Sequence, residues 1–201
     1  MKADGEIFIN GGKIFAFADN NDGIDSNGKM WINGGLVIAS GSSAPEEGLD
    51  CDRSQDFIVT GGTLIGTGGA SVSTSSNITQ RSVIYNGISA ATGMFVITNS
   101  NRTLVLQYEV PRSMDSLSLF FSSADIKSGE TYKVYTDGSI EGASDSWNGW
   151  YVGGTYTGGS QLGSFTSSSV TTTVGQSSGP GGGGPGGGRP GNGDWGPGWW
   201  G

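Results

Sequence analysis

The chain has 201 residues, a formal net charge of −8, no histidine and 39 glycines. An acidic chain lacks the basic surface that binds a nucleic-acid backbone, and catalysis by a serine or cysteine nucleophile with histidine as its base is excluded. No apolar run reaches the roughly 18 residues that a membrane-spanning helix needs. Short runs of β-branched and aromatic residues between glycines predict an all-β protein.

The first third of the chain repeats itself. Residues 4–25 and 27–50 share an apolar run, a Gly-Gly pair, a second apolar run and a polar stretch that ends in acid-Gly-apolar-Asp, and residues 56–69 form a weaker third copy. Repeats of this length are typical of a solenoid, in which each unit buries its apolar face against the next. The regular leucine pattern of leucine-rich repeats is missing, and the Gly-Gly pairs argue against helical repeats. A short parallel β-helix is therefore predicted for residues 1–75.

The alternation of apolar and polar residues predicts which side chains point into this coil and that their neighbours point outward. The inward residues are Ile7, Ile9, Ile14, Ala16, Ile32, Val37 and Val59. The three Gly-Gly pairs are expected to stack as a corner that needs positive φ or close backbone approach. Because the chain enters the repeat abruptly and shows no signal peptide, we expect earlier turns in a longer secreted protein. A complete protein with a short first strand is the alternative.

The rest of the chain changes character. Residues 76–174 contain apolar runs at hairpin spacing, which predict an antiparallel sheet or small sandwich that caps the end of the coil. A cap is needed because the last turn of a solenoid otherwise exposes apolar side chains and an unpaired strand edge. Residues 175–201 form a Gly/Pro/Trp-rich tail, which is predicted to be a flexible extension.

The repeated acidic motif is the main indication of function. Stacking of the two copies places Asp22 over Glu47 and Asp25 over Asp50, and carboxylates about 5 Å apart repel each other unless they hold a proton or a cation. Calcium suits this arrangement because it prefers several oxygen ligands, whereas metals that need thiolate or imidazole ligands are disfavoured. The alternative is that these side chains form Asx-turns at the corners and remain solvated. The repetition of the motif favours calcium.

Aromatic residues offer a second candidate surface. Trp147, Trp150 and Tyr151 lie in a Gly-rich stretch and could stack on sugar rings, although filling the core of the cap is the favoured interpretation. Trp31 alternates with Ile32 and should face outward from the coil. Arg53 is the only residue positioned to act as the base of a calcium-dependent lyase, and a salt bridge to Asp50 or Asp52 is the favoured alternative.

The segment INGGKIFAFADNNDGIDSNGKMWINGGLVIAS, followed by EEGLDCD and by the stretch from QRSVIYNG to TYKVYTDG, resembles a bacterial family of secreted carbohydrate-binding domains. The resemblance covers residues 4–140 and implies a right-handed parallel β-helix, similar in fold to polysaccharide lyases. The type member of the family is a calcium-containing binder of acidic pectic polysaccharide (polygalacturonate). The cation ligands implied by the resemblance are Asp22, Asp25, Glu47, Asp50 and Asp52.

These observations predict a non-enzymatic protein, outside the cell or on its surface, that uses Ca²⁺ to bind an acidic polysaccharide. Two alternatives stay open. One is a structural module of a surface layer or filament, in which coils of neighbouring copies stack end to end as a homo-oligomer. The other is a calcium-dependent polysaccharide lyase.

Overall fold

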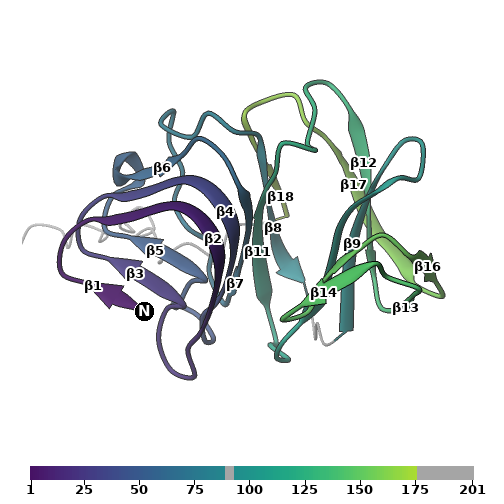
Figure 1. Cartoon of the computed structure of the whole chain (residues 1–201), viewed down its shortest axis with the longest axis horizontal. Coiled ribbons are helices and arrows are strands. Elements are labelled where there is room, and N and C mark those ends of the chain that lie inside the picture. Colours follow the sequence, from purple (N-terminus) through teal and green to yellow (C-terminus); the bar gives the residue numbers. More distant parts are fainter. Residues whose placement is uncertain (89–92, 176–201) are drawn as a thin grey trace, which may run out of the picture.

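The computed structural model describes residues 1–88 and 93–175 (Figure 1). Within these residues the chain is all-β, as predicted, and its only helical element is the short 3-10 helix η1 (Ser54–Asp56). The predicted tail lies outside the described residues, apart from Gly175.

The acidic copies of the repeat form a small parallel sheet. It contains β1 (Lys2–Ala3), β3 (Ile24–Ser26) and β5 (Leu49–Cys51) in that order. Ile24 pairs with Leu49, and Asp25 pairs with Asp50. Equivalent residues of the two copies therefore lie side by side, as the repeat predicted.

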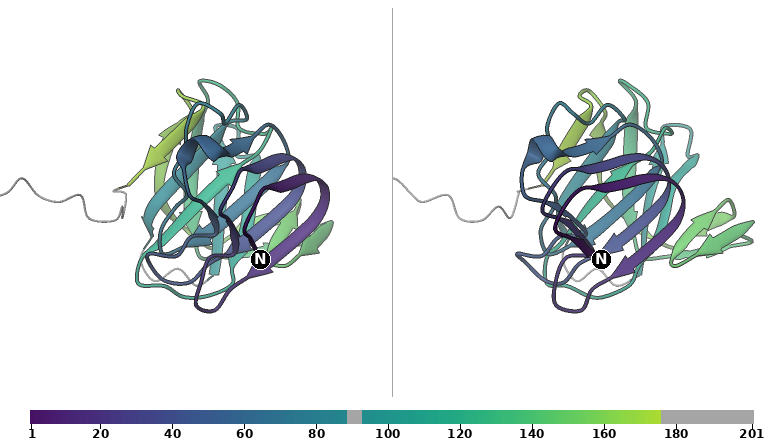
Figure 2. Two further views of the ribbon diagram at one scale, coloured as in Figure 1. Left: turned by 90° about the vertical axis from the view of Figure 1, so that its left-hand side faces the viewer. Right: turned by 60° about the vertical axis from the view of Figure 1, so that its left-hand side comes forward.

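The apolar copies of the repeat also stack in parallel. β2 (Ile7–Phe17) pairs with β4 (Met30–Ser40), and β4 pairs with β6 (Phe57–Val59) and β7 (Thr63–Gly68). Ile9, Ile32 and Val59 occupy one level across the strands. In Figure 2, where the first loop of the chain comes toward the viewer, these segments appear as successive loops.

The second glycine of each Gly-Gly pair makes the corner between the two apolar runs. Gly12, Gly35 and Gly62 have φ angles of 84°, 95° and 94°, in the left-handed region that strains other residues. A Cβ atom on Gly35 would lie 2.7 Å from the carbonyl oxygen of Gly12. The corner therefore requires glycine both for its backbone angle and for the close approach of successive copies.

The predicted inward residues are buried to different degrees. Ile9, Ile32, Val37 and Val59 are at most 4% exposed. The remaining three, Ile7, Ile14 and Ala16, are only half-buried. All three belong to β2, which in the described part of the chain pairs with β4 alone, so no further strand covers them.

Later strands extend the same sheet. β11 (Leu117–Ser122) pairs antiparallel with β7 and with β8 (Ser82–Ile88), and β18 (Thr171–Val174) then joins β8 in parallel. This sheet thus combines strands that precede residue 75 with strands that follow it. The two groups meet where β11 pairs with the edge of β7.

A second sheet, which is antiparallel, lies against the first (Figure 1). Its strands in spatial order are β14 (Asp145–Trp147), β15 (Trp150–Val152), β10 (Leu104–Val110), β9 (Gly93–Asn99), β12 (Thr131–Thr136) and β17 (Ser160–Thr166). A separate hairpin-like pair consists of β13 (Ser139–Glu141) and β16 (Thr155–Thr157).

The contact between the two large sheets buries residues on the outward side of the parallel strands. Ile38 faces away from its inward neighbour Val37, yet Ile38 and Ile65 are completely buried in one cluster with Phe95 and Tyr108 of the second sheet. The parallel strands are thus covered on both faces, which the short apolar runs of β4 and β7 permit. Of the strands β2, β4, β6 and β7, only β2 carries large apolar side chains that are exposed, among them Phe8 and Phe15.

We expect Ile65→Ala to lower the free energy of unfolding by about 2–5 kcal/mol, the usual cost of a cavity in a closed core. Ile14→Ala should cost less than half as much, because Ile14 is half-buried at the edge of the sheet. Urea unfolding of the two variants measures the difference. Equal losses would contradict the assignment of Ile65 to a core closed by the second sheet.

Candidate metal-binding site

Three aspartates converge on one side of the small parallel sheet. Each of Asp22, Asp25 and Asp50 has a carboxylate oxygen within 4.8 Å of those of the other two. Asp25 and Asp50 face each other in the register of β3 and β5, and their side chains therefore share one face of the sheet. Asp22 lies in the turn before β3, so the group combines two strands and a corner.

The backbone of the second copy holds Asp22 in place. The Glu47 N–H donates a hydrogen bond of 2.6 Å to Oδ1 of Asp22, and Gly23 and Ile24 donate their N–H groups to the carbonyls of Glu47 and Gly48. A Cβ atom on Gly23 would lie 2.7 Å from the Gly48 carbonyl oxygen. The glycine of the acid-Gly-apolar-Asp motif is therefore what lets the two corners stack.

Glu47 completes the acidic cluster, which we define as Asp22, Asp25, Glu47 and Asp50. Its side chain is half-buried, and its Oε2 atom is buried without a hydrogen-bond partner among the described residues. Burial, followed by the charges of Asp50 and Asp22, raises the pKa of Glu47 from 4.5 to about 8. Burial and the charges of Asp22 and Asp25 likewise raise the pKa of Asp50. The repulsion expected from stacked carboxylates is thus present, and a proton on Glu47 relieves part of it.

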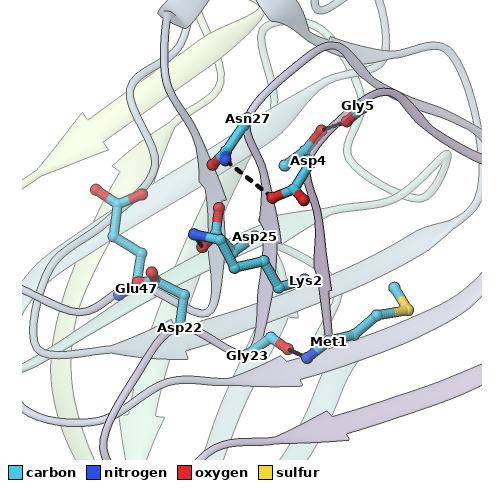
Figure 3. A network of polar contacts seen from close by, with 10 residues as sticks. Met1, Lys2, Asp4, Gly5, Asp22, Gly23, Asp25, Asn27 and Glu47 are labelled. Atoms are coloured by element: carbon cyan, nitrogen blue, oxygen red, sulfur yellow. Dashed lines mark hydrogen bonds and ion pairs between the residues drawn. The ribbon is translucent and has the colours of Figure 1, made fainter.

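Lys2 is a member of this site that the sequence interpretation missed. Its Nζ lies 2.6 Å from Oδ2 of Asp25 (Figure 3), and this hydrogen bond raises the pKa of Lys2. Lys2 is largely exposed, whereas Asp25 is largely buried. Lys2 pairs with Asp25 in the register of β1 and β3, one level before Asp50, but a strand of two residues carries too little pattern to be found in the sequence.

Two other predicted residues lie outside the group of three aspartates. Asp52 is exposed beyond the end of β5, from where its charge still contributes to the raised pKa of Asp50. Arg53 was expected to pair with Asp50 or Asp52 but instead places Nε 2.5 Å from Oδ2 of the buried Asp56. That prediction was wrong because η1 turns the chain and brings Asp56 back toward Arg53.

The predicted aromatic residues form no common platform. Trp31 is half-buried and stacks on Phe8, with ring centroids 6.1 Å apart and an interplanar angle of 7°. Trp147 and Trp150 pack at the edge of the core between the sheets, which agrees with the favoured interpretation that they fill the cap. Tyr151 donates its hydroxyl to Glu109 at 2.8 Å.

Comparison of the chain with protein-family models, with curated proteins and with solved structures finds no match. A search of the described residues finds no helix that is long and apolar enough to cross a membrane. The function is therefore inferred from the residues of the site.

The pKa of Glu47 predicts how stability changes with pH in the presence of a chelator. The folded protein keeps the Glu47 proton up to about pH 8, whereas an ordinary glutamate loses it near 4.5. The free energy of unfolding should therefore fall as the pH rises from about 4.5 to 8. Glu47→Gln should remove this contribution and stabilise the protein at pH 8 by about 1–3 kcal/mol.

Urea unfolding at several pH values measures the effect. Glu46→Gln is the matched control, since it removes the same charge one position earlier and Glu46 does not contribute to the raised pKa of Glu47. Parallel pH profiles for the wild type and Glu47→Gln would contradict the buried, protonated state of Glu47.

Proposed function

We propose that the protein binds Ca²⁺ at the acidic cluster and uses it to bind an acidic polysaccharide, without catalysing a reaction. The observation that supports this most directly is the convergence of the Asp22, Asp25 and Asp50 carboxylates within 4.8 Å. Aspartate oxygens are the ligands that Ca²⁺ prefers, and three carboxylates leave some of its six to eight positions for water and for a ligand.

Calcium would change the sign of this surface. The cluster has four carboxyl groups, and within the described residues Lys2 is the one basic side chain paired with it. A bound divalent ion supplies the largest local charge and attracts the carboxylates of an anionic chain. It would also compete with the proton on Glu47 and with the exposed ammonium of Lys2, since both now compensate the same negative charge.

The proposed fold family is that of secreted, right-handed parallel β-helices that bind carbohydrate, and the proposed location is outside the cell or on its surface. Support comes from the parallel registers β1–β3–β5 and β2–β4–β7, which a coil of this kind requires. The lyase alternative has less support, because its candidate base, Arg53, is paired with Asp56.

Calcium should raise the melting temperature of the wild type, since a ligand that binds only the folded state at 100 times its Kd stabilises it by about 2.7 kcal/mol. Asp25→Asn and Asp50→Asn should abolish this shift and the binding of polygalacturonate, as should a chelator. Differential scanning calorimetry and a pull-down with the polymer measure both effects.

Asp52→Asn is the control, because Asp52 is exposed outside the group of three aspartates. Its loss should leave the calcium shift nearly unchanged. If calcium changes neither melting nor polymer binding in the wild type, the proposal fails. If Asp52→Asn behaves like Asp25→Asn, the ligand set implied by the family resemblance is right and the set defined by geometry is wrong.

The open edge of β2 favours a second candidate function, which is end-to-end assembly with another copy of the chain. Among the described strands β2 pairs only with β4, and Phe8, Phe15 and Phe17 on it are 58%, 39% and 43% exposed. An unpaired edge with apolar side chains is a template for a further strand.

Sedimentation velocity at rising protein concentration should then show dimers or longer species. Phe8→Lys should shift the population to monomer, whereas Leu162→Lys, at an exposed leucine of β17, should not. A wild type that stays monomeric at high concentration would exclude assembly through β2.

A further inference from the structure

A pocket of about 390 Å³ lies between the second sheet and the β13–β16 pair. Figure 1 shows β9 and β16 at the opposite end of the molecule from β3 and β5, so the pocket is separate from the acidic cluster. Its volume is within the usual range of small-molecule sites, roughly 300–1,000 Å³. The described residues that line it are Thr98, Arg102, Leu104, Tyr135, Gly154, Thr155 and Tyr156. None of them is acidic, in a chain of net charge −8.

The side chain of Thr98 is an unsatisfied polar group in this pocket. Thr98 lies on β9 and is only 6% exposed, and its Oγ1 is buried without a hydrogen-bond partner among the described residues. Buried hydroxyls without a partner are uncommon because their desolvation is not compensated. With a turn of the Thr98 side chain about its Cα–Cβ bond, a hydroxyl-bearing ligand in the pocket would supply the missing partner.

Arg102 lies in the turn between β9 and β10 and has an unusual backbone. Its φ is 63°, in the left-handed region that a non-glycine residue rarely adopts. The Asn99 side chain holds this turn, because its Oδ1 accepts hydrogen bonds from the N–H groups of Asn101 at 3.0 Å and Thr103 at 2.9 Å. Within the described residues the Arg102 guanidinium makes no ion pair or hydrogen bond. The turn therefore presents an unpaired cation at the cost of a strained residue, as is common at binding sites.

Two tyrosines form the aromatic wall of the pocket. Tyr135 and Tyr156 meet edge to face with centroids 5.8 Å apart, and the Tyr156 hydroxyl donates to the carbonyl of Asp137 at 3.0 Å. Tyr156 is thus held in place, and both tyrosines are half-buried. Burial and the charge of Asp137 raise the pKa of Tyr156. The carboxylate of Asp137 is therefore close enough to this wall to affect it. Lys133 pairs with Thr98 in the register of β12 and β9, and its exposed side chain shares that face of the sheet.

We propose that this pocket binds one carboxylated sugar residue. Arg102 would bind the carboxylate in bidentate fashion, which a planar guanidinium does well. The hydroxyls of Thr98 and Thr155 would bond to ring hydroxyls, and the Tyr135 ring would contact the apolar face of the sugar. The ligand class rests on the proposed binding of acidic polysaccharide, but the pocket acts without calcium, because its cation is Arg102.

The test uses the full chain in the presence of EDTA, titrated with galacturonate and, in parallel, with the neutral sugar galactose. Isothermal calorimetry or NMR shifts of the Tyr135 and Thr98 signals report binding. We expect galacturonate to bind at least tenfold more tightly than galactose. Arg102→Gly should lose galacturonate binding at least tenfold while its melting temperature stays equal or rises, because glycine adopts a φ of 63° without strain. Arg102→Lys should bind with intermediate affinity.

Lys29→Ala is the control, since it removes the same charge from an exposed residue directly before β4, at the other end of the molecule. The inference is overturned if galacturonate fails to bind in EDTA, or if Arg102→Gly binds it as well as the wild type does. Binding that needs calcium and is lost in Asp25→Asn but not in Arg102→Gly would overturn the pocket and leave the calcium proposal standing. Binding in EDTA that depends on Arg102, with no effect of calcium on the polymer, would overturn the calcium proposal alone.

Discussion

The parallel hydrogen bonding between successive copies of the repeat is the constraint on which the rest of the structure depends. In-register pairing places equivalent residues at the same level, as Ile9, Ile32 and Val59 show. Polar positions obey the same rule, because the Asn33 amide donates to Asn10 at 2.8 Å and the Thr60 hydroxyl donates to Asn33 at 2.8 Å. Whatever the sequence repeats, the structure therefore stacks.

This stacking has opposite energetic consequences for the apolar strands and for the acidic cluster. Apolar residues gain from it, since each buried aliphatic side chain contributes roughly 1.5–3 kcal/mol. Carboxylates lose from it, because burial and mutual repulsion raise the pKa values of Glu47 and Asp50. A chain that keeps an unfavourable acidic stack beside a favourable apolar one has the local conflict expected at a functional site. This conflict is the physical reason for proposing a cation there.

The second sheet determines which surfaces of the repeat are buried and which stay exposed. It covers the outer side of β4 and β7, so that Ile38 and Ile65 become core residues. It leaves the edge of β2 and the acidic cluster uncovered. These are the regions to which assembly and calcium binding are assigned. On its far side, the β13–β16 pair closes a pocket around Thr98 and Arg102. The three candidate surfaces thus lie where the two sheets do not cover each other.

The sequence by itself determined the strand character, the glycine corners and the pairing of Asp25 with Asp50, because these follow from the period of a local repeat. It did not reveal that Asp22 joins this pair while Asp52 stays outside the group, or that Lys2 forms an ion pair with Asp25. Those depend on how the corner turns and on a strand of two residues, which carries too little pattern to recognise. Only the tertiary structure decided that Ile38 is buried against the second sheet and that Arg102 shares a pocket with Tyr156. Both facts arise from packing between segments far apart in the chain, and a repeat specifies only the neighbours that it stacks.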